Sequence, residues 1–166
     1  MVGFLDDAGV AARVLEHIEQ GTTDRGDGIW QEPVANYRSP ERFARELALL
    51  RRSAVPFCPS AALAESEAYV AREAAGTPLL AVRDETGRVP VFRNACRHRG
   101  MQLADGGGCT KGFVCRYHGW TYRLDGRLRH IPNDDGFPGI DKETHGLVPV
   151  AAEERGGLVW VRQEEG

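Results

Sequence analysis

The stretch RNACRHRGMQLADGGGCTKGFVCRYHGWTY, residues 93–122, decides how this chain folds and what it can hold. It contains a C-x-H pair, Cys96 and His98, and sixteen residues later a C-x-x-H pair, Cys115 and His118. A glycine closely follows each pair, and glycine supplies the backbone freedom that a tight turn needs. The spacing predicts two loops that bring two thiols and two imidazoles to one place.

Pairs made of one cysteine and one histidine are typical of a Rieske [2Fe-2S] centre. In such a centre two thiolates hold one iron and two imidazoles hold the other. We therefore expect Cys96 and Cys115 on one iron, and His98 and His118 on the other; these are cofactor ligands, and no catalytic residue is predicted. The alternative is a zinc-stabilised structural or interaction module. Zinc fingers, however, usually pair cysteine with cysteine and histidine with histidine on a helix.

The motifs C-R-H-R-G-M and C-R-Y-H-G-W-T-Y resemble the Rieske domain of ring-hydroxylating oxygenase large (alpha) subunits. The resemblance covers most of the chain, from about Ile29 to Val161. Rieske proteins of respiratory and photosynthetic cytochrome complexes differ, because they resemble C-T-H-L-G-C and C-P-C-H with a disulfide between the loops. Met101 and Tyr117 occupy those cysteine positions here. The comparison implies the oxygenase or ferredoxin branch and a reduction potential near the low end of the Rieske range, roughly −150 mV.

The resemblance also implies a function. In that family electrons pass from a reductase or ferredoxin to the Rieske cluster and then to a mononuclear iron in another domain or chain. A catalytic domain follows the Rieske domain in those subunits, whereas this chain ends at Gly166. His17, His130 and His145 do not form a convincing set of two histidines and one carboxylate for a mononuclear iron. We expect an electron-transfer component that is not a complete oxygenase alone, with a stand-alone Rieske ferredoxin or a redox sensor as alternatives.

The pattern of apolar and polar residues changes near residue 54. Before it, one helix is predicted from Ala8 to Gln20 with Asp7 as its cap and Gly21 as its stop, and a second from Pro40 to about Arg51 with Ser39 as its cap. After it, short apolar runs alternate with turn residues, which indicates strands. We predict a mainly β fold, an antiparallel sandwich or barrel of Rieske type with two cluster-binding loops, preceded by two N-terminal helices.

The predicted strands fall into groups. One hairpin joins 78–83 to 88–93, and a set at 113–115, 120–124 and 127–131 turns at Asp125-Gly126. Two more strands follow at 147–151 and 158–162. The predicted domains are an N-terminal helical extension and linker, 1–29, and the Rieske domain, 30–166.

Composition limits the other function classes. No apolar run is long enough to span a bilayer, and the acidic start at Asp6 and Asp7 does not resemble a secretory signal, so we expect a cytoplasmic protein without membrane contact. Two cysteines are left over. Cys58 lies in an apolar stretch and is predicted to be a buried, inert thiol. Cys109 lies between the loops, where it either packs in the loop or contacts the surroundings of the cluster.

Charge is unevenly distributed along the chain. Residues 93–130 hold eight basic and two acidic side chains, a net charge of +6, whereas the whole chain carries −3. A basic rim around the cluster would steer an acidic electron donor such as a ferredoxin. The alternative is a solvated face whose arginines pair with acidic residues elsewhere in the fold. Nucleic-acid binding is not expected, because the overall charge is negative and none of the usual nucleic-acid motifs is present.

Overall fold

The computed structural model describes residues 5–164 and divides the chain into two compact units, residues 1–39 and 40–166. The first unit contains helix α1 (Asp7–Gln20) and a short 3-10 helix, Val34–Arg38. The second contains helix α2 and every strand. The domain boundary predicted near residue 30 stays a prediction.

Helix α1 is confirmed, with a correction to its cap. The capping residue is Asp6 and not Asp7, because Asp6 has an extended backbone and its carboxylate accepts the N–H of Gly9 at 2.8 Å. Asp7 already belongs to the first turn of the helix, where its negative charge interacts favourably with the positive end of the helix dipole. Gly21 ends the helix in the left-handed conformation, as predicted (φ 61°).

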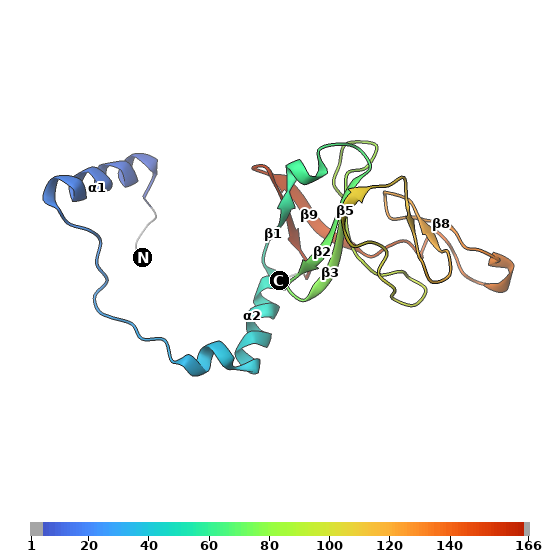
Figure 1. Cartoon of the computed structure of the whole chain (residues 1–166), viewed down its shortest axis with the longest axis horizontal. Coiled ribbons are helices and arrows are strands. Elements are labelled where there is room, and N and C mark those ends of the chain that lie inside the picture. Colours follow the sequence, from blue (N-terminus) through green and yellow to red (C-terminus); the bar gives the residue numbers. More distant parts are fainter. Residues whose placement is uncertain (1–4, 165–166) are drawn as a thin grey trace. The chain divides into compact units, whose positions relative to one another are not determined.

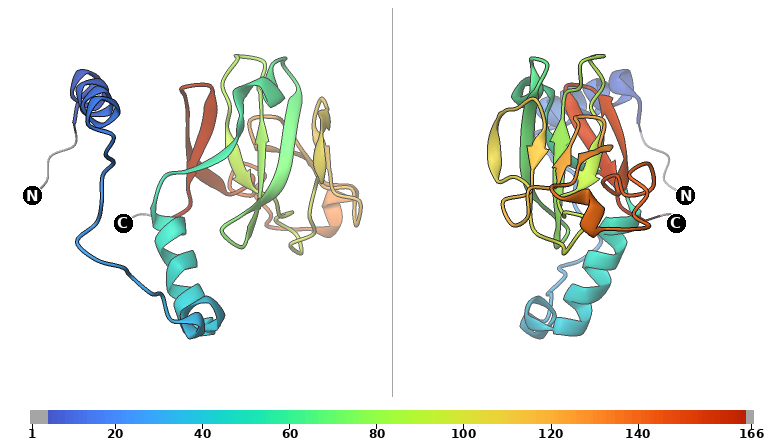
Figure 2. Two further views of the ribbon diagram at one scale, coloured as in Figure 1. Left: turned by 60° about the vertical axis from the view of Figure 1, so that its left-hand side comes forward. Right: turned by 90° about the vertical axis from the view of Figure 1, so that its right-hand side faces the viewer.

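Helix α2 (Pro40–Arg52) begins at the predicted proline and leads directly into the strands (Figures 1 and 2). Its last turn is tied to the far end of the chain. The carbonyl of Arg51 accepts the backbone N–H groups of Gln163 and Glu164 at 2.9 and 3.0 Å. The Arg51 side chain also donates to the carbonyl of Ala75 at 2.9 Å. These bonds fix α2 to the β structure although none of its residues is buried.

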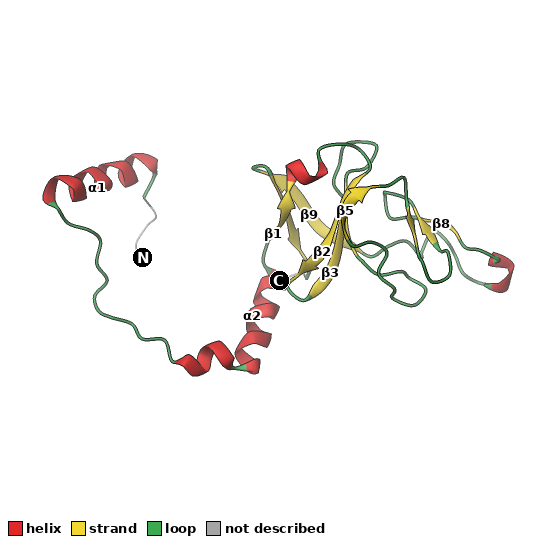
Figure 3. Cartoon of the chain, in the orientation of Figure 1, coloured by secondary structure: helices red, strands yellow, loops and turns green. Residues whose placement is uncertain are grey.

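Two antiparallel sheets make up the β structure, which confirms the mainly β prediction with two helices before it (Figure 3). The larger has the order β1-β10-β9-β4-β3-β2-β5, and the smaller has the order β6-β7-β8. The strands are β1 (Val55–Pro59), β2 (Ala68–Ala74), β3 (Thr77–Val82), β4 (Val91–Arg93), β5 (Gly106–Cys109), β6 (Phe113–Val114), β7 (Thr121–Tyr122), β8 (Leu128–His130), β9 (Pro149–Arg155) and β10 (Leu158–Arg162).

The predicted pairings are confirmed. Strands β3 and β4 form the expected hairpin, and β6, β7 and β8 form the expected group, with the turn closed by a hydrogen bond from the N–H of Gly126 to the carbonyl of Arg123 at 3.0 Å. Strands β9 and β10 pair from Arg155↔Leu158 to Ala151↔Arg162. The small sheet lies at the end of this unit away from α2 (Figures 1 and 2).

Strand β3 separates two hydrophobic cores. Successive side chains of a strand point to opposite faces, so Leu79 and Ala81 enter a core with β1, β9 and β10, while Leu80 and Val82 enter the core that contains the predicted cluster cysteines. All four are fully buried. This double burial explains why β3 is a continuous apolar run without polar alternation.

Strand β5 was not predicted, because its three consecutive glycines indicate a loop. The structure places it at the edge of the large sheet, antiparallel to β2. A Cβ atom on Gly108 would lie 3.3 Å from the ring of Tyr69 on β2. The aromatic ring therefore occupies the space that a side chain would need, and glycine permits the pairing.

None of the helices between residues 5 and 164 combines the length and apolar character needed to cross a bilayer.

Candidate metal centre

Two loops of nearly identical backbone carry the four predicted ligands. In the first, the N–H of Gly100 donates to the carbonyl of Cys96 at 2.8 Å; in the second, Gly119 donates to Cys115 at 2.9 Å. The two glycines have φ values of 73° and 74°, a region that side chains disfavour. Each cysteine N–H also donates, at 2.8 Å, to the carbonyl of the residue five positions later. The histidines leave these matching turns from different positions, the third in one loop and the fourth in the other.

The two loops place the cysteines in one core and the two histidine rings beside each other. Cys96 and Cys115 are each 3% exposed and belong to the same hydrophobic core. The rings of His98 and His118 have their centroids 4.8 Å apart. His118 is exposed, whereas His98 is partly covered. Two buried sulfur atoms beside two imidazoles make a donor set that suits iron with bridging sulfide.

Several features test whether these residues fit a two-iron cluster. The Nδ1 atom of His98 is buried without a hydrogen-bond partner, which is costly unless a ligand takes its lone pair. Among residues 5–164, no three histidine, cysteine, aspartate or glutamate side chains converge on one point as a single metal ion requires. A two-iron cluster asks for two protein ligands on each iron. The donor set therefore fits this group.

Burial perturbs the ionisation of the site. It raises the pKa of the Cys96 thiol. Burial, followed by the charges of His118 and Arg99, lowers the pKa of His98. An imidazole that stays neutral is ready to bind a metal, whereas the thiol must release its proton on binding. Loading of the site is therefore coupled to proton release.

Tyr122 on β7 is the hydrogen-bond partner of the first loop. Its hydroxyl lies 3.2 Å from the sulfur of Cys96 and accepts the backbone N–H of Arg97 at 2.9 Å. Because the oxygen accepts from Arg97, its hydrogen is available to the sulfur. Burial raises the pKa of Tyr122 and keeps it protonated. No pattern in the sequence indicates this bond.

Aromatic side chains cover His98. The ring of Trp120 stacks on it with centroids 5.0 Å apart and planes 9° apart. The ring of Phe137 lies edge-on to both, with its centroid 5.7 Å from that of His98 and 5.8 Å from that of Trp120. Trp120 itself is only 2% exposed. Phe137 was missed, because it lies in a polar, turn-rich segment with no recognisable pattern.

Asn94 was also missed, although it fixes the segment after the first loop. Its side-chain oxygen accepts the N–H groups of Leu103 and Ala104 at 2.9 and 3.3 Å, and its nitrogen donates to the carbonyl of Ala104 at 2.7 Å. Asn94 is 4% exposed, one of two buried polar side chains in the described part of the chain. An asparagine two residues before a cysteine gives no signal of this role in the sequence.

The rim of the site is basic and partly apolar. Arg97, Arg99 and Arg116 are exposed, and none of them forms an ion pair with any of residues 5–164. The guanidinium of Arg99 lies 5.7 Å from the ring centre of Tyr117, which is itself 55% exposed. The alternative in which internal acidic partners neutralise these three arginines is therefore not observed.

The remaining histidines and cysteines lie elsewhere. His17 is on α1, His130 ends β8, and the Nδ1 atom of His145 lies 2.7 Å from the carbonyl of Asp141. Cys58 is buried and burial raises its pKa, in agreement with an inert thiol. Cys109 is exposed on the edge strand β5.

A small antiparallel β domain that holds two cysteines and two histidines on paired loops defines an iron–sulfur protein. The family model for the Rieske [2Fe-2S] domain matches residues 53–147. The chain belongs to this family, and its cofactor is a Rieske-type [2Fe-2S] cluster.

Known proteins similar to this chain are oxygenase subunits. The carnitine monooxygenase oxygenase subunit of Acinetobacter baumannii is 33% identical over 153 residues, which is 91% of this chain and 41% of that protein. The alpha subunit of biphenyl 2,3-dioxygenase from Rhodococcus jostii is 43% identical over 86 residues, 50% of this chain and 18% of that protein. This chain therefore spans less than half the length of these relatives.

Solved structures agree. The apo form of a quaternary ammonium Rieske monooxygenase has a TM-score of 0.78 at 31% identity, over 84% of this chain and 41% of that one. Naphthalene 1,2-dioxygenase from Rhodococcus sp. has a TM-score of 0.76 at 26% identity, over 97% of this chain and 36% of that one. The Rieske-type fold predicted from the sequence is confirmed.

Proposed function

We propose that Cys96 and Cys115 bind one iron of the cluster, that His98 and His118 bind the other, and that the domain relays single electrons within a Rieske oxygenase. The donor is a ferredoxin or reductase. The acceptor is a mononuclear iron in an oxygenase catalytic domain or subunit. The observation that carries this proposal is the pair of matching loops, which bury both cysteines in one core and hold the two histidine rings 4.8 Å apart, with His118 at the exposed side.

The cluster, when bound, supplies a one-electron couple. The protein's own residues set the conditions for it. The buried cysteines keep sulfur away from water, Tyr122 directs a hydrogen bond at Cys96, and Trp120 and Phe137 exclude solvent from His98. The exposed His118 offers the short path to a partner.

Metal analysis and a redox titration test the proposal. The loaded protein is expected to contain two irons and two acid-labile sulfides and to accept one electron for each cluster. Rapid reoxidation on mixing with the catalytic domain of a related oxygenase should follow. A single zinc without sulfide would support the structural-module alternative. A cluster that changes partner binding but passes no electron would indicate a redox sensor.

Tyr122→Phe is expected to lower the reduction potential. A hydrogen bond to a ligand sulfur stabilises the reduced, more negative state. A net worth of about 1 kcal/mol for such a bond corresponds to roughly 40 mV for a one-electron couple. Protein-film voltammetry measures the shift, and Tyr69→Phe is the control, since the Tyr69 hydroxyl forms no hydrogen bond with the ligand loops within residues 5–164. An unchanged potential would show that the Tyr122 hydroxyl does not act on Cys96.

Arg97→Ala combined with Arg116→Ala is expected to slow reduction by an acidic ferredoxin about three- to tenfold at low ionic strength, because unpaired cations beside the site raise the encounter rate. Stopped-flow measurement from low to high salt follows the effect, which should vanish at high salt. Arg155→Ala removes an exposed arginine from the end of β9 and controls for net charge. Equal slowing in this control would reject local steering.

A further inference from the structure

A second charged site lies away from the ligand loops. A cavity of about 390 Å³ is bordered by the β3–β4 turn on one side and by the small sheet on the other. Its lining includes the cations Lys111, Arg123 and Arg129, together with Thr86 and Glu85. Small-molecule sites commonly have volumes of about 300–1,000 Å³. The cavity is therefore large enough for a small ligand.

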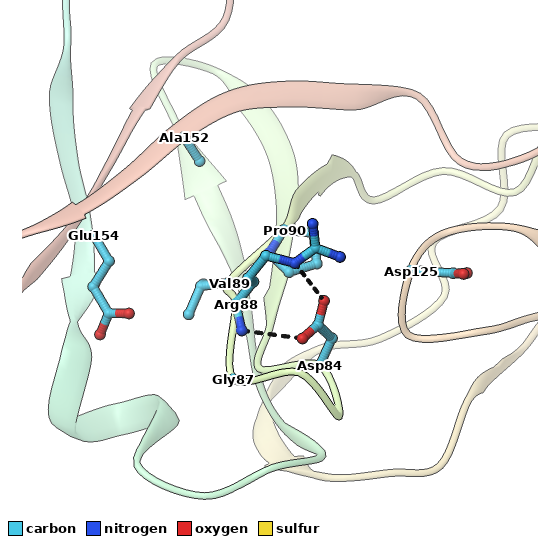
Figure 4. A pocket seen from close by; sticks show the side chains of 8 residues that line it. All are labelled: Asp84, Gly87, Arg88, Val89, Pro90, Asp125, Ala152 and Glu154. Atoms are coloured by element: carbon cyan, nitrogen blue, oxygen red, sulfur yellow. Dashed lines mark hydrogen bonds and ion pairs between the residues drawn. The ribbon is translucent and has the colours of Figure 1, made fainter.

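The three other charged groups in the lining have ion-pair partners. Asp84 accepts the backbone N–H groups of Thr86 and Arg88 at 2.8 and 3.0 Å, and its second oxygen lies 3.6 Å from the Arg88 guanidinium (Figure 4). Figure 4 shows this pair from an adjoining cavity, which Asp125 also borders. Asp125 in turn pairs with Arg127 at 3.7 Å.

What remains is an excess of positive charge. Lys111, Arg123 and Arg129 have no ion-pair partner within the described range 5–164. Glu85 is the one lining carboxylate without a partner in that range, so three cations face one anion. Like charges held together without counter-charges repel, and a bound anion removes that repulsion.

Hydrogen bonds fix the three backbone segments that carry these cations. Lys111 is at the tip of a turn in which the Thr110 hydroxyl donates to the carbonyl of Gly112 at 2.6 Å. Arg123 opens the β7–β8 turn, where its N–H donates to the carbonyl of Arg127 at 2.9 Å. Arg129 lies on β8 between residues paired with β7. Cations projected from separate rigid segments suit a ligand with several acceptor oxygens.

We infer that this cavity binds a small dianionic ligand, a phosphate or dicarboxylate group, independently of the cluster. The two guanidinium groups provide forked donors for an oxyanion, and Lys111 adds a point charge. The hydroxyl of Thr86 borders the same space. Glu85 opposes binding and limits the affinity.

Isothermal titration of the cluster-loaded chain with inorganic phosphate, at low ionic strength, tests this site. Saturable binding of one phosphate is expected. Arg123→Ala and Arg129→Ala should each weaken it roughly fivefold to tenfold, the range for loss of one charge-assisted bond. Glu85→Gln should strengthen it severalfold. Arg155→Ala, which changes net charge elsewhere, should leave it unaltered.

Competition with other anions shows which class of anion the site prefers. Competition by succinate supports a general oxyanion site, and failure of succinate beside binding of sulfate supports a phosphate-type site. Arg123→Lys keeps the charge and should retain part of the binding, which separates loss of the cation from loss of folding. The cluster absorption is followed throughout, so that phosphate bound by released iron is recognised. Non-saturable binding, or equal weakening in Arg155→Ala, would overturn the inference.

Discussion

Replacing Cys115 by serine is expected to abolish the Rieske absorption and electron paramagnetic resonance spectra. A serine oxygen is a poor substitute for a thiolate on iron, and the buried position offers no other sulfur donor once Cys96 is engaged. His118→Cys should also remove the normal spectra, because a third thiolate lowers the potential and changes the electronic structure that imidazole ligation creates. Iron and sulfide analysis accompanies the spectra.

The matched control is His130→Ala. His130 lies on β8 with an exposed side chain and is not part of either loop. Its removal should leave the spectra and the iron content intact. If His130→Ala removed the spectra while His118→Cys preserved them, the ligand assignment would be wrong.

Gly126→Ala is expected to destabilise the fold by about 2–5 kcal/mol. At this position φ is 83°, which costs a side chain about 1–2 kcal/mol. A Cβ atom would also lie 2.4 Å from the ring of Phe92, and overpacking of this kind costs about 1–3 kcal/mol. Phe92 belongs to the core that holds the cluster cysteines. The change should therefore lower the midpoint of thermal unfolding and weaken retention of the cluster.

Gly87→Ala separates the cost of backbone strain from the cost of the contact with Phe92. Gly87 has a φ of 81°, and a Cβ atom there would meet nothing within 4 Å. It should show the backbone strain alone, so the difference between the two variants measures the contact with Phe92. Thermal unfolding followed by circular dichroism, with cluster content assayed alongside, gives the comparison. Equal destabilisation of both variants would mean that the Phe92 ring moves aside without cost.

Local sequence patterns predicted much of the fold. The proline-led helix α2 and the glycine stop of α1 follow from backbone preferences that act within a few residues. The hairpin of β3 and β4 follows from alternating apolar runs around a polar turn. Strand β5 could not be predicted in this way, because the ring that lies against Gly108 belongs to Tyr69, which is on another strand.

The sequence by itself determined the cofactor and its candidate ligands, because a Rieske cluster requires two cysteines and two histidines in short pairs, and such pairs are visible in the chain as written. The tertiary structure decided the surroundings of those ligands. Tyr122 reaches the sulfur of Cys96 from 26 residues away, and Phe137 reaches His98 from a segment without regular pattern. Contacts of this kind depend on how strands and loops pack in space, and no local preference of the backbone encodes them.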